Sequence, residues 1–444
     1  RALTNTVWAQ AKMNITDPVM LGHVSDEVVA RVAENTAQQM ANCAWAFAKL
    51  GVRNEALLTA IADESSGRME EFSPQNLMSL LWACAKLHFM HPRLLSAAAE
   101  AAVGQLEDFS PQHLSIIAWS CATLGFRNPK LMDHIALESM RNMRLFSPQN
   151  LANLAWAYAT IDMRHDKLLG AISLSARQRL EEFNQQHMCN LAWAFSALQV
   201  VDEELLLALA EQVIARIQDF NPQGLSNMAC AFAVLGLAHH EMFEAIAAAA
   251  MQCVHECTPR DLESIAWAFA RLGIEKEGLM AAISESTVLR IHEFHAMDLA
   301  NMAWAFATLA LSDETLMLAL AGEVVKQVSE FSSQALGHTA WAFSMLSYAS
   351  PELMAAISAE VRAKVGDLEV QHIAVLLDAQ LSCQDVLGRR MGAMIRQFVE
   401  AFPKSEEQWK SPEYPKFLKM LQVDNFGLIG SQFLLARLGI ERAP

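Results

Sequence analysis

The stretch FSPQNLANLAWAYATI, residues 146–161, decides the fold of this chain because its pattern returns at a fixed distance along most of the sequence. Counted from Trp156, a tryptophan recurs every 37 residues in both directions, with one cysteine in the series: Trp8, Trp45, Trp82, Trp119, Trp156, Trp193, Cys230, Trp267, Trp304 and Trp341. A fixed period of this size is typical of one supersecondary unit stacked many times. Since no insertion breaks the register, we expect the function to lie on a repeated surface and not in a single pocket.

The repeat at residues 72–108 illustrates the unit. Ser73 is a residue type that caps helix N-termini, and Pro74 follows at the first helical position, where a missing N–H costs nothing. Apolar residues from Leu77 to Leu87 then recur at helical spacing and form one face. This part of the repeat predicts a first helix, helix A.

A second helix signal follows within the same repeat. His91 and Pro92 supply another cap and first turn, and the apolar pair Leu94 and Leu95 opens a helix B that runs to the next phenylalanine, Phe109. Two helices per period make a helical hairpin, and stacked hairpins make an α-solenoid. The sequence therefore predicts an all-α protein, an α-solenoid of about ten 37-residue helix-turn-helix repeats with a C-terminal helical cap.

The repeat array is predicted to cover residues 1–383, and its first repeat is truncated because Arg1 falls inside the expected first helix. Asp378 stands in the tryptophan position of the last unit, and a polar residue there suits an array that is ending. Residues 384–444 are predicted to form C-terminal capping helices.

The recurrent tryptophans and the cysteines are both expected to be structural. Alanines flank each tryptophan, as in LAWAYA, so the indole is expected to fill the space between units, at a cost of about 3–5 kcal/mol on truncation to alanine. Most of the eight cysteines replace apolar residues of other repeats, which predicts small buried hydrophobes in a reducing compartment.

The repeated motif resembles that of a known family. FSPQNLANLAWAYATI at 146–161, FNQQHMCNLAWAFSAL at 183–198 and HAMDLANMAWAFATL at 295–309 are similar to the octotricopeptide and heptatricopeptide repeats of organellar RNA-binding proteins. The 37-residue period matches the heptatricopeptide form, and the resemblance covers about residues 1–383. It implies a role in RNA processing, stability or translation, or as a component of a ribosome or another ribonucleoprotein, in a mitochondrion or plastid.

Alignment of the repeats on their tryptophans separates four polar columns on helix A, at seven, six and three residues before the tryptophan and four after it. The −7 column is mostly glutamine and the −3 column mostly asparagine, while the +4 column holds lysine, threonine or arginine. These offsets share one side of a helix. The −6 column varies between repeats, as a modular base reader requires, because helical-repeat proteins can read one base per repeat.

Single-stranded RNA, such as rRNA or mRNA, is therefore the predicted partner. The candidate RNA-binding residues are Gln39, Asn42, Lys49, Asn76, Ser79, Lys86, His113, Asn150, Asn153, His187, Asn190, Asn227, Asp261, Arg271, Asp298 and Asn301. The alternative for the same columns is structural: glutamine and asparagine would bond neighbouring repeats, and the varying column would only be solvated. Both roles can coexist.

Charge argues against strong nonspecific RNA binding. The chain has a net charge of −16, and residues 1–383 contain 24 Lys and Arg against 42 Asp and Glu. Polyanions bind basic surfaces by counterion release. However, many acids fall at the end of helix B, and the bases favour the early repeats, so the first half is expected to hold an RNA backbone more firmly.

Other functions have weaker support in the sequence. The alternative function is an acidic scaffold that holds basic protein partners, such as ribosomal proteins, in an organellar complex. The sequence carries no phosphate-binding glycine loop or metalloprotease motif, and the group Cys253, His255 and Cys257 lacks the paired spacing of a zinc site. We therefore expect no catalytic residues, no metal and no cofactor. The chain has no apolar run long enough to span a bilayer, so membrane insertion is not expected.

Overall fold

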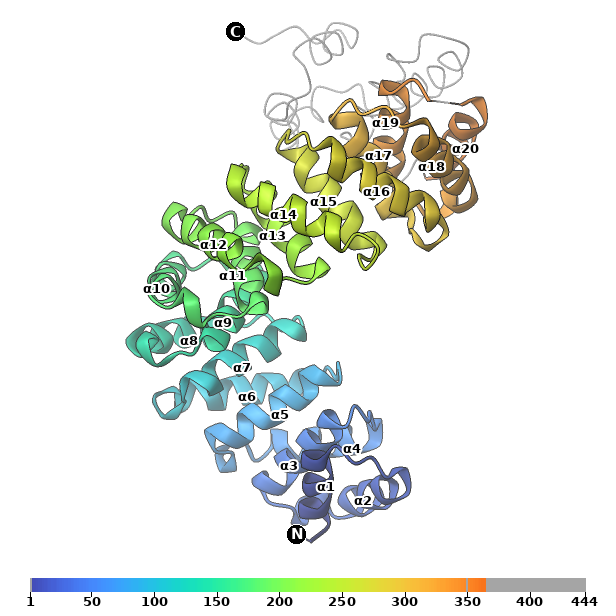
Figure 1. Cartoon of the computed structure of the whole chain (residues 1–444). Helices are drawn as coiled ribbons and strands as arrows, with labels where there is room; N and C mark the ends of the chain where they lie inside the picture. Colours follow the sequence, from blue (N-terminus) through green and yellow to red (C-terminus); the bar gives the residue numbers. More distant parts are fainter. Residues whose placement is uncertain (1, 349, 365–444) are drawn as a thin grey trace, which may run out of the picture. The chain divides into compact units, whose positions relative to one another are not determined.

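The computed structural model describes residues 2–348 and 350–364 (Figure 1). Within these residues the chain forms twenty α-helices and eight short 3-10 turns, and no strand. It divides into two compact units, Arg1–Phe220 and Asn221–Pro444. The predicted boundary at residue 383 and the predicted capping helices at 384–444 lie outside the described residues.

The twenty helices form ten pairs, in which an odd-numbered helix A is followed by an even-numbered helix B. The A helices are α1 Ala2–Met13, α3 Ala37–Lys49, α5 Pro74–Lys86, α7 Pro111–Thr123, α9 Pro148–Thr160, α11 Gln185–Ala197, α13 Pro222–Val234, α15 Pro259–Arg271, α17 Ala296–Thr308 and α19 Ser333–Met345. The B helices are α2 Pro18–Ala30, α4 Glu55–Ser66, α6 Pro92–Gly104, α8 Pro129–Arg141, α10 Asp166–Arg177, α12 Glu203–Ala215, α14 His240–Gln252, α16 Glu277–Leu289, α18 Glu314–Gln327 and α20 Pro351–Ala363. The 3-10 turns are Val32–Glu34, Met69–Glu71, Leu106–Asp108, Met143–Leu145, Leu180–Glu182, Ile217–Asp219, Ile291–Glu293 and Val328–Glu330.

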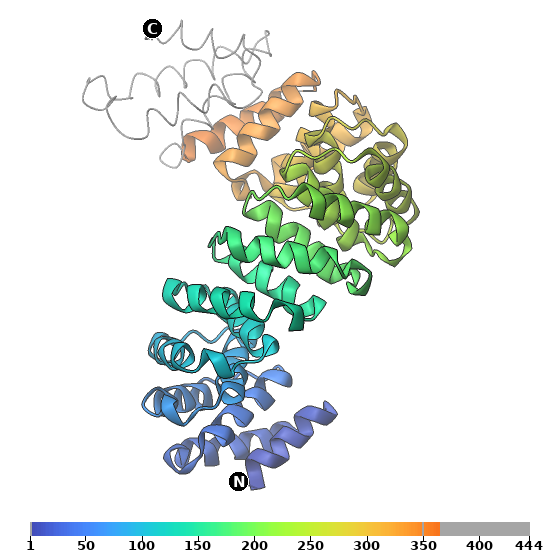
Figure 2. The same cartoon turned by 90° about the vertical axis from the view of Figure 1, so that its left-hand side faces the viewer.

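Within each unit the A helices pack side by side in one layer and the B helices in a second. In the first unit α7 contacts α9 and α9 contacts α11, while α8 contacts α10 and α10 contacts α12 (Figure 1). The side view shows successive pairs of this unit one above another (Figure 2). In the second unit α13, α15, α17 and α19 form the A layer, and α14, α16, α18 and α20 the B layer. The predicted α-solenoid is confirmed.

The predicted helix starts are also confirmed. The Ser73 hydroxyl accepts a hydrogen bond from the N–H of Asn76, and Pro74 is the first residue of α5. At the second start, the His91 ring accepts from the N–H of Leu94. Each cap satisfies a backbone donor that the first helical turn leaves without a partner.

Every A helix ends on a residue with positive φ, six positions after the tryptophan. These residues are Asn14, Gly51, His88, Gly125, Asp162, Gln199, Gly236, Gly273, Ala310 and Ser347. In α5 the N–H of His88 bonds to the carbonyl of Ala85, and the N–H of Phe89 to that of Cys84, which closes the helix end. Six of the ten are not glycine, so this turn was not visible as a glycine pattern in the sequence.

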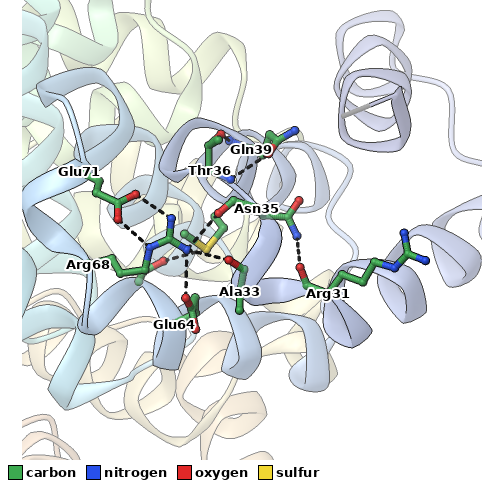
Figure 3. A network of polar contacts seen from close by, with 10 residues as sticks. Arg31, Ala33, Asn35, Thr36, Gln39, Glu64, Arg68 and Glu71 are labelled. Carbon is green, nitrogen blue, oxygen red and sulfur yellow. Dashed lines mark hydrogen bonds and ion pairs between the residues drawn. The ribbon is translucent and has the colours of Figure 1, made fainter.

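A side-chain clamp joins consecutive repeats at the turn after helix B. Arg68 donates from Nη1 to the carbonyl oxygens of Ala33 and Asn35 in the preceding repeat, while Glu64 and Glu71 hold its guanidinium (Figure 3). The same position, 33 residues after the carbonyl it binds, repeats the contact in six other places: Gln105 to Phe72, Arg179 to Phe146, Arg216 to Phe183, Arg290 to Cys257, Gln327 to Phe294 and Lys364 to Phe331. These bonds fix the register between neighbouring hairpins.

The core of most repeats is built from alanine, leucine and two aromatic positions. In the fifth repeat Phe146, ten residues before the tryptophan, and Tyr158, two after it, are fully buried. Cys43, Cys84 and Cys121 are buried, and desolvation raises the pKa of each thiol to about 12. The prediction that these cysteines act as small buried hydrophobes is therefore confirmed.

Candidate nucleic-acid interface

The four polar columns lie on the solvent side of the A layer. Along α5, for example, Gln75 is exposed near the start of the helix, Trp82 is half-buried in the middle, and Lys86 is exposed at the end. Residues seven before, three before and four after the tryptophan share one helical face. A surface with the same composition therefore repeats across each A layer.

The tryptophans themselves lie on this surface: they contact one another between neighbouring units, as expected, but they are only partly buried. None of the nine tryptophans among the described residues is buried, and Trp8 and Trp193 are 40% and 38% exposed. The residues beside the tryptophan, mostly alanine, are buried instead, and so in most repeats is the residue two positions later. In α3 these are Ala44, Ala46 and Phe47, all buried.

The indoles form ladders across neighbouring A helices. In the first unit, Trp8, Trp45 and Trp82 are the first ladder, with ring centroids 6.5 and 6.2 Å apart. Trp119, Trp156 and Trp193 are the second ladder, with the same two spacings. In the second unit Trp267 and Trp304 lie 6.5 Å apart. Sequence reasoning found the tryptophan period but not this exposed row, because a period does not tell which side of a helix a residue occupies.

A lysine of the chain already contacts the first ladder. The Lys12 ammonium lies 5.2 Å from the ring centroids of both Trp8 and Trp45. This is the geometry of a cation–π contact. One position of the +4 column can therefore reach the gap between two consecutive indoles.

The −6 column, predicted to read bases, is the third residue of every A helix from α3 to α19, and six of its members take part in capping. The side chain of Asn150 accepts from the N–H of Ser147, and the Ser147 hydroxyl accepts from the N–H of Asn150. This reciprocal pair is a capping box. The same pairing is made by Gln39, His113, His187, Asp261 and Asp298.

Several of these residues also bond to the neighbouring repeat. Asn150 donates from Nδ2 to the Ser115 hydroxyl, and the His113 ring bonds through Nε2 to the side chain of Gln75. Burial lowers the pKa of His113 and of His187, so both rings favour the neutral form. The varying column is thus not merely solvated, because its members cap helices and bond to neighbouring repeats, and base contact by it stays a prediction.

The −3 column differs, because its amides are free. Within the part of the chain that the structure describes, the side chains of Asn42, Asn153, Asn190 and Asn227 make no hydrogen bond, and they are half-buried or exposed. An amide carries two donors and an acceptor that a base edge can use. The remaining members are engaged: the Ser79 hydroxyl, which is buried, accepts from Gln75, and Asn301 donates to Glu263.

The +4 column carries free cations in the early repeats. Lys49 and Lys86 are exposed and form no ion pair among residues 2–348 and 350–364, and the same holds for Arg271 in the second unit. Asn76, the remaining candidate, is half-buried at the third position of α5. The structure thus places most candidates on one face and leaves the −3 and +4 columns available to a ligand.

Acidic residues are absent from the A layer of the first unit. The six helices α1, α3, α5, α7, α9 and α11 contain no Asp or Glu, and their only charged residues are Lys12, Lys49 and Lys86. In the second unit α15 and α17 carry Asp261, Glu263 and Asp298. Desolvation raises the pKa of Glu263, which is buried, to about 7. The negative charge of the first unit lies on its B helices and on the turns and loops between helices.

In the described stretches no three His, Cys, Asp or Glu side chains come together in a way that could hold a metal ion. No helix in those stretches has the length and apolar character needed to cross a bilayer.

Comparison with known proteins places the chain in a family. No curated protein matches it in sequence. A homology model of the full-length AP-3 complex in an intermediate open conformation is similar in structure, with 12% identity and a TM-score of 0.38 over 96% of this chain and 90% of that one. The model of the RNA-editing substrate-binding complex 6 protein family matches residues 1–109 and 67–314. Since these matches cover more than half of the sequence, the chain belongs to the RNA-editing substrate-binding complex 6 protein family.

Proposed function

We propose that this protein is an RNA-binding helical-repeat subunit of an RNA-processing complex, and that single-stranded RNA lies along the A layer of the first unit. The family's description names an RNA-editing complex that binds substrate, which supports both an RNA and partner subunits. The observation that carries the proposal is the A layer without carboxylates, lined by Lys12, Lys49 and Lys86 in a chain whose net charge is −16. Six consecutive A helices there let phosphates approach without repulsion from the helix that they contact, and three of these helices add a lysine.

Mitochondrial location is part of the proposal. The resemblance to organellar RNA-binding repeats and the RNA-editing family both support it, whereas the plastid named as a second location gains no support from the family. Membership of the octotricopeptide or heptatricopeptide families stays a prediction, as does the absence of catalytic activity.

Modular base contact belongs to the same proposal. The half-buried −3 amides of Asn153 and Asn190, in consecutive repeats, have no partner within the described residues, as a reader of neighbouring bases requires, and Asn42 offers a third such amide. The −6 residues could contribute a second contact per repeat, since capping uses only part of their hydrogen-bonding capacity.

Measuring RNA affinity over a range of salt concentrations tests the proposal. The double variant Lys49→Ala and Lys86→Ala should weaken binding and lower the salt slope by about one per lysine. The matched control is Lys130→Ala with Lys167→Ala, two exposed lysines of the B helices α8 and α10. Equal loss in both pairs would place the RNA elsewhere, and no RNA binding by the purified chain or in crosslinked native extract would overturn the function itself.

A protein-binding role for the second unit is favoured by one observation. Its helix α17 carries Asp298 as its only charged residue, near the helix start, half-buried and open in part to solvent. An acidic face suits a basic partner, which keeps the scaffold alternative for this unit. Crosslinked peptides from α17 joined to another protein would support it.

A further inference from the structure

The two tryptophan ladders of the first unit differ in the residue one helical turn after each indole. In the first ladder this residue is Lys12, Lys49 or Lys86. In the second ladder it is Thr123, Thr160 or Ala197, which are short and uncharged. The chain therefore covers an indole pair of the first ladder with its own ammonium, at Lys12, and has no side chain of that reach in the second.

The second ladder is also bordered by free amides. Asn153 and Asn190 lie one turn before Trp156 and Trp193, and their side chains have no hydrogen bond within the described residues. Trp193, at the end of the ladder, is 38% exposed. An exposed aromatic row beside unsatisfied amides fits a planar ligand with a polar edge.

We propose that Trp119, Trp156 and Trp193 form a stacking platform for unpaired bases of single-stranded RNA. The proposal rests on the RNA binding proposed above and assigns it a site that the polar columns alone do not. Unpaired bases stack on aromatic side chains, and such stacking tolerates any sequence because every base has a π face. The asparagine amides then meet the base edges, and the lysines of the first ladder meet the phosphates of the same strand.

Charge favours RNA over a cationic peptide as the occupant. Arginine side chains also stack on indoles, but a basic peptide needs carboxylates nearby. The A helices of this unit have none, and the free ammonium groups of Lys49 and Lys86 would repel it. An RNA phosphate backbone, by contrast, meets no repelling carboxylate on these helices and is attracted by the ammonium groups of the lysines.

The ring spacing limits how a base can bind. Two aromatic contacts at van der Waals distance need about 7 Å between the outer rings. The centroids in the second ladder are 6.5 and 6.2 Å apart, and the rings are tilted by 32° and 33°. A base can therefore stack on an outward ring surface as the ladder stands, or enter a gap after the two rings separate by less than about 1 Å.

Binding of a short oligoadenylate to the full chain tests the proposal. The triple variant Trp119→Leu, Trp156→Leu and Trp193→Leu should lose about tenfold in affinity for each base that stacks. The single variant Trp156→Phe should retain more binding than Trp156→Leu because it keeps a ring. The matched control, Trp267→Leu with Trp304→Leu in the second unit, should bind as the wild type does.

A second probe separates stacking from phosphate binding. An abasic oligomer with the same backbone should bind the wild type as weakly as the oligoadenylate binds the triple variant. If the triple variant and the wild type bind oligoadenylate equally, the stacking site is wrong while the RNA-binding function stands. If the wild type binds no RNA at all, the proposed function fails, and the stacking site with it.

Two further measurements use the wild-type chain and so do not depend on whether a variant folds. Ultraviolet crosslinking of the wild-type chain to RNA should yield adducts on the tryptophan peptides of α7, α9 and α11. Adducts confined to other peptides would overturn the proposal. It would also be overturned if an arginine-rich peptide, and not RNA, changed the indole fluorescence lost in the triple variant.

Discussion

Arg179, in the turn that follows α10, donates a hydrogen bond from Nη1 to the carbonyl oxygen of Phe146, 33 residues earlier and 3.0 Å away. Its other guanidinium nitrogens pair with Glu182, which raises the pKa of the arginine and lowers that of the carboxylate. The Arg179 side chain thereby donates to a backbone carbonyl of the preceding hairpin, while Glu182 in its own turn neutralises its positive charge. Because the bond joins two hairpins at a fixed spacing of 33 residues, it helps to hold the register of the stack.

Replacing Arg179 by alanine should lower the free energy of unfolding by about 1–2 kcal/mol, because the Phe146 carbonyl loses a charge-assisted partner. Arg179→Gln should cost less, since Gln105 and Gln327 make the same contact in their own repeats. Urea unfolding of both variants measures the difference. Equal losses would mean that the clamp is not the source of the effect.

Trp156→Ala should destabilise the chain less than Phe146→Ala does. Phe146 is fully buried, so its truncation should cost about 3–5 kcal/mol. Trp156 is half-exposed, and its truncation should cost about 1–2 kcal/mol. The thermal unfolding midpoints of the two variants give the comparison. A larger decrease for Trp156→Ala than for Phe146→Ala would support the structural role first expected for the tryptophan.

Ala310→Gly should stabilise the protein by about 1 kcal/mol. Ala310 ends α17 at φ 53°, a left-handed conformation that strains any residue with a Cβ atom. Gly273 occupies the same place after α15 at φ 65°, so Gly273→Ala should cost a similar amount. The test is whether the two thermal midpoints move in opposite directions, and a shift of the same sign would contradict it.

The stability of the second unit should fall as pH rises from about 4.5 to about 7, through Glu263. Burial raises the pKa of this carboxyl to about 7 in the folded chain, above its ordinary value of 4.5, so the folded state holds a proton that the unfolded state has lost. The decrease in the free energy of unfolding is complete above the pKa of the folded state and is at most about 3 kcal/mol. Below 4.5 both states are protonated and the effect vanishes.

Glu263→Gln isolates this effect, because the glutamine oxygen can still accept from Asn301. The variant should be more stable than the wild type at pH 8 and equally stable at pH 4. Denaturant unfolding of both chains at the two values gives the comparison. A constant difference across the range would assign the effect to packing and not to titration.

Asn150→Asp should preserve stability yet change base preference if the −6 column reads RNA. Asp261 caps its own helix and accepts from the Ser226 hydroxyl, so an aspartate at 150 can do the same with Ser147 and Ser115. Asparagine favours adenine and aspartate accepts from cytosine, so the preference should shift between these bases. Unchanged preference in selection from a random RNA pool would leave the column with its capping role alone.

The sequence by itself determined the helical repeat, because caps, prolines and apolar spacing act within a few residues of one another. Ser73, Pro74 and the leucines of α5 predict that helix without any tertiary information, and the fixed period implies stacking. The concentration of acidic residues outside the A helices of the first unit could be predicted too, since helix A and helix B occupy separate stretches of the sequence. The positive-φ turn at Ala310 and the clamp at Arg179 could not, as mixed residue types fill both positions.

Only the tertiary structure decided what each column faces. Trp156 and Tyr158 are two residues apart on one helix, yet the tyrosine is buried against the B layer and the tryptophan joins an exposed row with Trp119 and Trp193. Both are large aromatic residues, so composition cannot separate the core from the surface. The direction of each side chain depends on where the next hairpin packs, and that is a property of the stack and not of the repeat.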